Sequence, residues 1–193
     1  MSANPKKRLA VAPMMEWTDR HCRSFHRTLT KEAVLYTEMV TTGALMHGDV
    51  PRHLDYSQDQ HPVVLQLGGS EPSDLSKSAE LAQQWGYDEI DLNCGCPSST
   101  VTGRGAGSSL LKDPDLLYQI AKAMVNAVTI PVTIKMRSGY EDTSLFKEKL
   151  LAAEESGVRY ITLHPRTKVE GYTPPARWDL IAQAKATVKV PVV

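Results

Sequence analysis

Five polar or reactive side chains accompany short apolar runs of the sequence and are of types that bind or transform ligands. They are Gln66, Asn93, Cys96, Lys135 and His164. Two amides, an ammonium and an imidazole suit a planar heterocycle that carries phosphate, and a thiol can donate a proton, attack a substrate or bind a metal. A Cys-x-Cys pair without a second pair is a poor zinc site, so no metal is expected. These residue types favour proton donation or nucleophilic catalysis by a thiol.

The apolar runs predict strands that would bring these side chains together. Alternate residues of a barrel strand face the barrel interior and the surrounding helices. In residues 63–67 the apolar positions 63, 65 and 67 suit the helix layer, which leaves Gln66 facing inward. The same alternation turns three further pairs inward, namely Asp91 with Asn93, Lys135 with Arg137, and His164 with Arg166. We therefore expect the side chains to meet at the C-terminal face of a barrel, where barrel enzymes carry their active sites.

Apolar runs alternate with longer amphipathic segments along the whole chain, which is typical of parallel strands joined by crossover helices. The runs cover residues 9–12, 34–37, 63–67, 89–93, 132–135 and 160–164, and a seventh begins at 190. Helices are predicted over 75–85 and 116–128, where prolines and acidic residues precede the apolar positions, and Gly86 and Gly157 are expected to end two helices. The sequence predicts the α/β class, with a TIM (β/α)8 barrel as one catalytic domain over residues 1–193, truncated within strand 7.

An open doubly wound sheet is the alternative fold. Its phosphate-binding fingerprint is missing, because the glycine-rich stretch 103–108 lacks the third glycine at the required place.

Composition restricts the class of protein further. The chain has 193 residues, of which 41% are apolar and 23% charged, so it can bury a core. Its 22 basic residues balance its 22 acidic ones, which excludes a general nucleic-acid coat and leaves nucleic-acid binding to a local patch. No apolar run has the roughly 18 residues of a membrane span, and residues 1–8 are polar and basic without an apolar signal region. Three cysteines indicate a reducing compartment, so we expect a cytoplasmic protein.

The three cysteines differ in their sequence context. Cys96 follows the strand end, precedes Pro97 and leads into the glycine- and serine-rich segment 98–109, where a mobile loop over the mouth is expected. Cys94 lies closer to the strand and could be a small buried residue, and Cys22 is expected to pack in the helix layer. Cys96 is therefore the favoured reactive thiol.

Four motifs together resemble the tRNA-dihydrouridine synthases over essentially the whole chain. They are the segments 11–19 (VAPMMEWTD), 36–39 (YTEM), 66–69 (QLGG) and 92–98 (LNCGCPS), accompanied by Lys135 and His164-x-Arg166. The resemblance implies an FMN-dependent oxidoreductase acting on a CH–CH group. Such an enzyme uses NADPH to reduce the C5=C6 bond of a D-loop uridine in tRNA, and it has a barrel followed by a small helical domain that helps to bind tRNA.

The resemblance also implies roles for individual residues. Pro13, Met14 and Met15 would line the flavin ring, Gln66 would bond its pyrimidine edge, Lys135 would lie near its electron-rich side, and His164 would help to hold FMN. Asn93 would lie near the flavin and the target base, and Cys96 would be the proton donor. Arg137 and Arg166 are candidates for contacts with tRNA, as are Arg104 and Lys168, for which a solvated surface cation is an equal alternative.

The resemblance leaves several questions open. Residues 16–23 and 38–44 resemble the branch that acts around position 20 of tRNA, whereas residues 164–168 are more like other branches. We expect a monomer, and we expect the 193 residues alone to be largely inactive because strand 8 and the helical domain would be missing. Two other functions remain alternatives: a flavin barrel that reduces a free pyrimidine or a related small molecule, and a non-catalytic scaffold that keeps the barrel fold.

Overall fold

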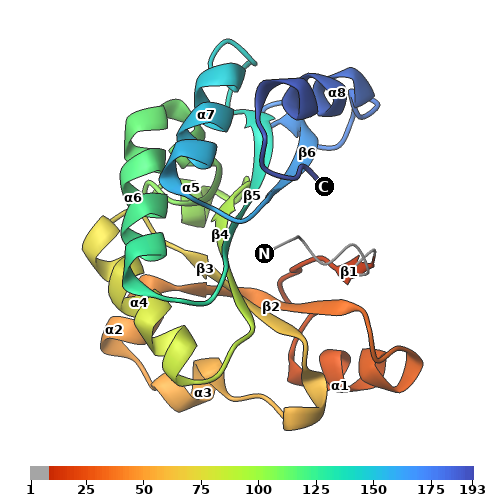
Figure 1. Ribbon diagram of the computed structural model, residues 1–193, viewed down its shortest axis with the longest axis vertical. Coiled ribbons are helices and arrows are strands. Elements are labelled where there is room, and N and C mark those ends of the chain that lie inside the picture. The colour runs from red at the N-terminus through yellow and green to blue at the C-terminus, as the bar shows by residue number, and fades with distance from the viewer. Residues whose placement is uncertain (1–8) are drawn as a thin grey trace.

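The computed structural model describes residues 9–193, so the polar start of the chain, residues 1–8, lies outside the described residues. Its centre is a six-stranded parallel sheet in the order β1-β2-β3-β4-β5-β6 (Figure 1). The strands are β1 (Ala10–Val11), β2 (Val34–Thr41), β3 (Val63–Gly68), β4 (Glu89–Cys94), β5 (Val132–Gly139) and β6 (Ile161–Thr167). Each strand pairs with the next one along the chain, as the crossover pattern of the sequence predicts.

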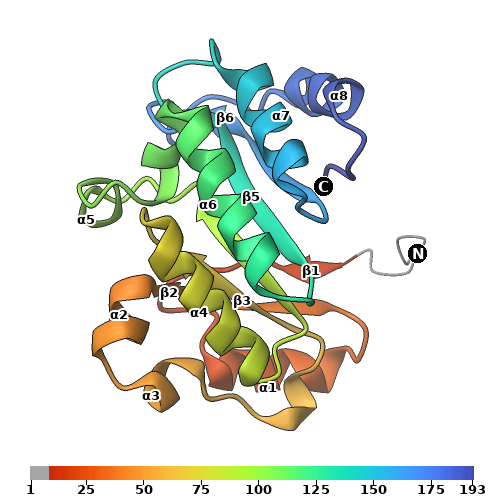
Figure 2. The same ribbon diagram turned by 60° about the vertical axis from the view of Figure 1, so that its left-hand side comes forward.

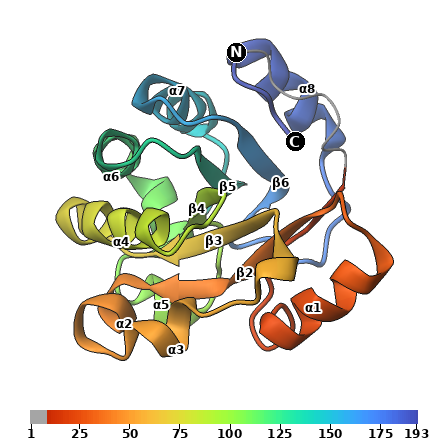
Figure 3. The ribbon, with the colours of Figure 1, turned by 60° about the horizontal axis from the view of Figure 1, so that its bottom comes forward.

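Helical segments connect the strands and lie outside the curled sheet, which Figure 3 shows most clearly. The α-helices are α1 (Arg20–Leu29), α2 (Thr42–His47), α3 (Val50–Leu54), α4 (Pro72–Gln84), α5 (Ser99–Thr102), α6 (Pro114–Ala127), α7 (Phe146–Ser156) and α8 (Trp178–Thr187). Two 3-10 helices, η1 (Gln58–Gln60) and η2 (Gly107–Lys112), complete the connections. No helix of the described residues is long and apolar enough to cross a membrane.

Six of the seven apolar runs form strands within residues 9–193; β1 is shorter than its run, and several other strands extend beyond theirs. β2 continues to Thr41 and β5 to Gly139, and each passes through an irregular register, between Tyr36 and Met39 and between Arg137 and Gly139. The extension of β5 carries Arg137, which the alternation of its run turns inward. The seventh run contributes Val192, which makes an isolated parallel bridge with Ile161. The structure is therefore a curled α/β sheet of six parallel strands, and the prediction of truncation within a seventh strand stays a prediction.

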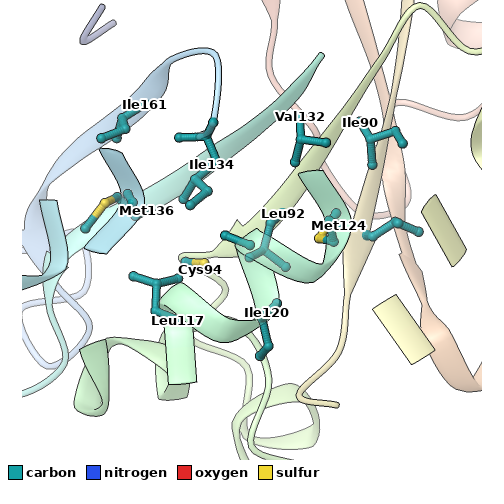
Figure 4. Packing of buried hydrophobic residues seen from close by; sticks show 14 of the residues in the cluster. Ile90, Leu92, Cys94, Leu117, Ile120, Met124, Val132, Ile134, Met136 and Ile161 are labelled. Atoms are coloured by element: carbon teal, nitrogen blue, oxygen red, sulfur yellow. The ribbon is translucent and has the colours of Figure 1, made fainter. Parts of the chain in front are cut away.

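The main core lies between the sheet and the helices. Ile90, Leu92 and Cys94 alternate along β4 and pack toward Leu117 and Ile120 of α6, all 1% exposed or less (Figure 4). The residues between them, Asp91 and Asn93, face the other side, as the alternation predicts. The helix layer thus holds β4 in the orientation that aims its polar side chains inward.

Local sequence signals fix the predicted helix ends. Asp113 caps α6 by accepting a hydrogen bond from the Leu116 amide, and Pro114 occupies the first turn. α4 also has a proline, Pro72, in its first turn but no side-chain cap, and it runs alongside α6 on the outer face (Figure 2). Gly157 ends α7 with a φ of 95°, a left-handed conformation that a residue without a Cβ adopts readily.

The interior of the curled sheet is closed at one end by polar side chains. The Tyr36 hydroxyl, on β2, lies 2.9 Å from the Tyr160 hydroxyl, which precedes β6 and donates to Glu89 Oε2 on β4. This connection joins the first and last parts of the sheet across the interior, 124 residues apart in the sequence. The opposite end of the interior, at the carboxyl ends of the strands, stays open and forms a cavity.

Candidate functional site

The carboxyl ends of four strands surround one cavity of about 210 Å³. Gln66 from β3, Asn93 from β4, Lys135 from β5 and His164 from β6 all line it. Adjacent strands pair in register here, with Gln66 opposite Asp91 and Asn93 opposite Lys135. The geometry therefore brings together the four polar side chains that strand alternation turns inward.

An apolar wall faces these polar groups. It comes from the segment after β1 and from β2, and consists of Pro13, Met14, Met15 and Met39. Thioethers are polarisable and make favourable contacts with aromatic rings. Met14 and Met15 are about half exposed, so one side of the cavity is open to a ligand. A cavity with one thioether wall and one polar wall suits a planar heteroaromatic ligand with polar edges.

The three cysteines have different environments. Cys96 is half-buried and lines the cavity together with Gly95 and Pro97. Cys94 is fully buried in the core, and this burial raises the pKa of its thiol well above the usual value. Cys22 lies in α1 with its sulfur 3.6 Å from His26 Nδ1, away from the cavity lining. Cys96 is therefore the cysteine whose thiol can reach a bound ligand.

The segment that carries Cys96 is held by its backbone. The Gly95 and Cys96 amides donate to Asn93 Oδ1 at 3.0 and 2.9 Å, and the Cys96 carbonyl accepts from the Ser108 amide at 3.0 Å. The following segment, expected as a mobile loop, contains α5 and η2, and Gly107 of η2 packs directly against Cys96. The position of Cys96 is thus defined by contacts on both sides.

Asp91 lies beneath the cavity and is completely buried. Its Oδ2 accepts from Gln66 Nε2 and its Oδ1 from Thr133 Oγ1, both at 2.7 Å. Burial raises the pKa of the Asp91 carboxyl to about 6, against the hydrogen bonds from Gln66 and Thr133 and the charge of Lys135, which lower it. At neutral pH a buried carboxylate therefore underlies the polar wall of the cavity.

Two cationic side chains, Lys135 and Arg137, line the cavity, although the whole chain has no net charge. Burial lowers the pKa of Lys135, while Asp91 opposes that shift. Burial and the neighbouring Arg137, Lys135 and Arg166 lower the pKa of His164 to about 4. The imidazole is then neutral at pH 7, and its Nε2 lies 3.0 Å from Arg166 Nη1, so this nitrogen accepts the hydrogen bond and Nδ1 carries the proton. Cations with a neutral imidazole favour an electron-rich or anionic ligand.

Arg137 lines the cavity and Arg166 does not, and the contact of both with tRNA stays a prediction. Arg137 is only 2% exposed, and its guanidinium donates to the carbonyls of Gly95, Thr167 and Gly171 at 2.9 to 3.0 Å. This arrangement ties the segment after β4 to the segment after β6. Arg166 bonds the Pro174 carbonyl and His164 and lies outside the cavity lining. Both guanidiniums therefore hold protein groups in this structure.

Tyr172 also lines the cavity, although alternation along the strands does not identify it. Its ring stacks on His164 with the centroids 5.8 Å apart, and the Arg137 guanidinium carbon lies 5.0 Å from its centroid. Tyr172 is 72% exposed and belongs to the segment between β6 and α8, which has no periodic pattern. Met39 and Met136 also line the cavity and were missed, because they lie just beyond the apolar runs 34–37 and 132–135. Among residues 9–193 no cluster of three or more metal-binding side chains occurs.

Comparison with known proteins gives a family match over almost the whole chain. The family model described as dihydrouridine synthase matches residues 10–193. A tRNA-dihydrouridine(20/20a) synthase from Pseudomonas putida is 46% identical over 192 residues, which are 94% of this chain and 57% of that protein. A protein of the same name from Vibrio parahaemolyticus is 49% identical over 163 residues, covering 82% of this chain and 50% of that protein. The chain thus spans about half the length of these curated relatives.

Solved structures give a likeness in fold. A 2,3-dimethylmalate lyase of the PEP mutase/isocitrate lyase superfamily superposes with a TM-score of 0.60 at 17% identity, covering 98% of this chain and 67% of that one. At this identity the match supports the fold alone.

Proposed function

Because this chain belongs to the dihydrouridine synthase family, we propose that its cavity binds FMN and takes part in the reduction of a uridine in tRNA. The observation that carries the proposal is the convergence of Cys96 with Gln66, Asn93, Lys135 and His164 on one cavity. The names of the relatives favour positions 20 and 20a as the target, in line with the resemblance of residues 16–23 and 38–44 to that branch. NADPH as the reductant, tRNA as the partner and a monomeric state belong to the same proposal.

The residues of the cavity fit FMN. Pro13, Met14 and Met15 offer an apolar surface for one face of a flat ring, and Gln66 offers an amide for a polar edge. Lys135 and His164 supply the cation and the neutral imidazole for an electron-rich group. When bound and reduced, FMN would supply the hydride for the C5=C6 bond.

The protein's own residues would complete the reaction at the base. Hydride addition to one carbon of a conjugated double bond leaves the other carbon in need of a proton, so an acid must stand beside it. Cys96 is the half-buried thiol of the cavity lining, and Asn93, whose side chain holds the Cys96 amide, lies next to it. We assign Cys96 as the proton donor to C5 and Asn93 to contact with the flavin and the base. The target base would have to leave the tRNA stack to enter this cavity.

The test begins with flavin binding. FMN fluorescence is titrated with the chain, with Lys135→Met and with Lys168→Met, a matched control whose ammonium lies 5.1 Å from the Tyr140 ring centroid and outside the cavity lining. We expect Lys135→Met to weaken binding by about tenfold, the loss of roughly one charge-assisted contact, and Lys168→Met to leave it unchanged. A chimera extended with the C-terminal part of the Pseudomonas putida relative serves as a second sample. Failure of both chain and chimera to bind FMN would contradict the proposal.

Turnover is measured on the chimera with FMN, NADPH and tRNA that lacks dihydrouridine. Cys96→Ala should abolish dihydrouridine formation, whereas Cys22→Ser, which changes a cysteine outside the cavity, should retain it. Turnover of free uracil or dihydroorotate without tRNA would favour the small-molecule alternative. Full activity of Cys96→Ala would exclude the assigned proton donor.

A further inference from the structure

A continuous line of hydrogen bonds runs from Asp91 to the backbone of Cys96. Asp91 Oδ2 accepts from Gln66 Nε2 at 2.7 Å, and Gln66 Oε1 accepts from Asn93 Nδ2 at 2.8 Å. Asn93 Oδ1 then accepts from the Gly95 and Cys96 amides. Two side-chain amides therefore stand between a buried carboxylate and the segment that carries the thiol.

The two ends of the line fix the direction of every bond in it, because the carboxylate can only accept and the backbone N–H groups of Gly95 and Cys96 can only donate. An ionised carboxylate has no proton to donate, so Gln66 must turn its NH2 toward Asp91 and its oxygen toward Asn93. Asn93 must then turn its own NH2 toward Gln66, which leaves its oxygen for the two backbone amides. An amide group in the place of Asp91 would leave only the backbone N–H groups to fix that direction, and the hydrogen bond from Gln66 would lose its charged acceptor.

We propose that Asp91 is a positioning residue that, through Gln66 and Asn93, orients the backbone of Gly95 and Cys96 and thereby places the Cys96 thiol in the cavity. The inference deepens the proposed function, since it concerns the residue assigned there as the proton donor. Asp91 itself is completely buried and absent from the cavity lining, so it acts through the two amides. Thr133, its other partner, lies on the opposite side of the carboxylate and is not part of the line.

The inference can be tested by moving the carboxylate from position 91 to position 66, the next residue along the line of hydrogen bonds. Asp91→Asn keeps the size of the side chain but removes the charged acceptor at the end of the line. Adding Gln66→Glu restores a charged acceptor one step further along the line, because the carboxylate introduced at position 66 would accept from the amide introduced at position 91 and from Asn93. Thr133→Val is the matched control, since it removes a hydrogen bond of the same carboxylate on the side away from Cys96.

Hydrogen exchange of the Gly95 and Cys96 amides is measured at about pH 7.5, above the Asp91 pKa of about 6, with the Leu117 amide of α6 as the reference for global stability. We expect Asp91→Asn to speed exchange at both amides by about tenfold relative to Leu117, as loss of roughly one hydrogen bond would. In the Asp91→Asn/Gln66→Glu variant both exchange rates should return to within about twofold of those of the original chain. In Thr133→Val they should likewise lie within about twofold of the original rates. Alkylation of Cys96 by iodoacetamide, followed by mass spectrometry, should change in Asp91→Asn and recover in the double variant.

Three results would overturn the inference: unchanged exchange in Asp91→Asn, no recovery in the double variant, or an equal effect of Thr133→Val. If the role of Asp91 were purely structural, the double variant would not recover, because it still carries two altered core residues. The readouts need neither FMN nor tRNA. If the exchange rates change as expected but the chimera reduces no tRNA, the proposed function fails and the positioning of Cys96 by Asp91 stands. If the chimera reduces tRNA but the exchange rates do not change as expected, the positioning fails and the proposed function stands.

Discussion

Gly107 offers a sharp test of how tightly Cys96 is held from the side opposite Asn93. Its φ is 61°, and a Cβ at this position would lie 2.8 Å from Val101 Cγ1, 2.9 Å from the Cys96 carbonyl oxygen and 3.2 Å from Cys96 Cβ. Two of these three atoms belong to Cys96, so Gly107→Ala must push that residue or shift η2. Gly171 has the same φ of 61° with nothing within 4 Å of its Cβ position, which makes Gly171→Ala a matched control.

The two substitutions separate backbone strain from steric conflict. The left-handed conformation costs an alanine about 1–2 kcal/mol at either position. At Gly107 the contacts add an overpacking penalty of about 1–3 kcal/mol. We therefore expect the free energy of unfolding to fall by about 1–2 kcal/mol in Gly171→Ala and by about 2–5 kcal/mol in Gly107→Ala.

Urea unfolding of the three proteins gives these free energies, and the alkylation rate of Cys96 by iodoacetamide reports where the thiol lies. The rate should change in Gly107→Ala and stay constant in Gly171→Ala. A difference in unfolding free energy below about 0.5 kcal/mol between the two variants, with equal alkylation rates, would refute the reasoning, because the Cys96 segment would then move aside without cost.

Three further predictions concern burial and charge. The pKa of Asp91 is raised from 3.8 to about 6, so the folded chain binds this proton more tightly than the unfolded chain; this stabilisation is full below pH 3.8 and is lost as the pH rises through 6. The free energy of unfolding of Asp91→Asn should therefore rise relative to that of the original chain over this window. Plots of unfolding free energy against pH, obtained with urea, that run parallel for the two proteins would contradict this. The pKa of His164 is lowered from 6.5 to about 4, so the stabilisation by its neutral imidazole is present above pH 6.5 and is lost as the pH falls through 4. An NMR titration of the imidazole should have its midpoint near pH 4, and the midpoint should rise in Arg166→Gln. A midpoint near 6.5 in the original chain would contradict the described electrostatics. Leu92→Ala in the core should lower the free energy of unfolding in urea by about 2–5 kcal/mol. Leu29 is 71% exposed, so Leu29→Ala should lower it by less than about 0.5 kcal/mol. Equal losses in the two variants would contradict the described packing of Leu92.

Alternation along the strands is the part of the site that a sequence can reveal. Apolar partners on the helix side identify Gln66, Asn93, Lys135 and His164 as inward residues, because the side-chain period of a strand is fixed by its backbone. The same rule turns Arg137 inward but cannot identify its partners. Those partners are backbone carbonyls of irregular segments after β4 and β6, whose conformation follows no period. Sequence alternation therefore places Arg137 at the cavity but does not reveal that its guanidinium joins two segments.

Tyr172 and Asp91 illustrate two further limits. Tyr172 reaches the cavity from an aperiodic segment, so its position depends on tertiary contacts with His164 and Arg137. Asp91 is recognisable as an inward residue, but its burial and its two hydrogen bonds depend on the register between β3, β4 and β5. Strand existence is thus predictable from local sequence, whereas the connections between strand ends require the assembled sheet.

The hydrogen bond between Tyr36 and Tyr160 has a consequence for the order of folding. The two hydroxyls close a loop of more than a hundred residues, since 124 positions separate them, whereas neighbouring strands such as β3 and β4 require only one crossover. Closing the longer loop costs more chain entropy and gains its contacts only after the intervening units have formed. We expect neighbouring strand–helix–strand units to assemble first and the curled interior to close last. Slow closure would leave the inner polar residues exposed to water in any late folding intermediate.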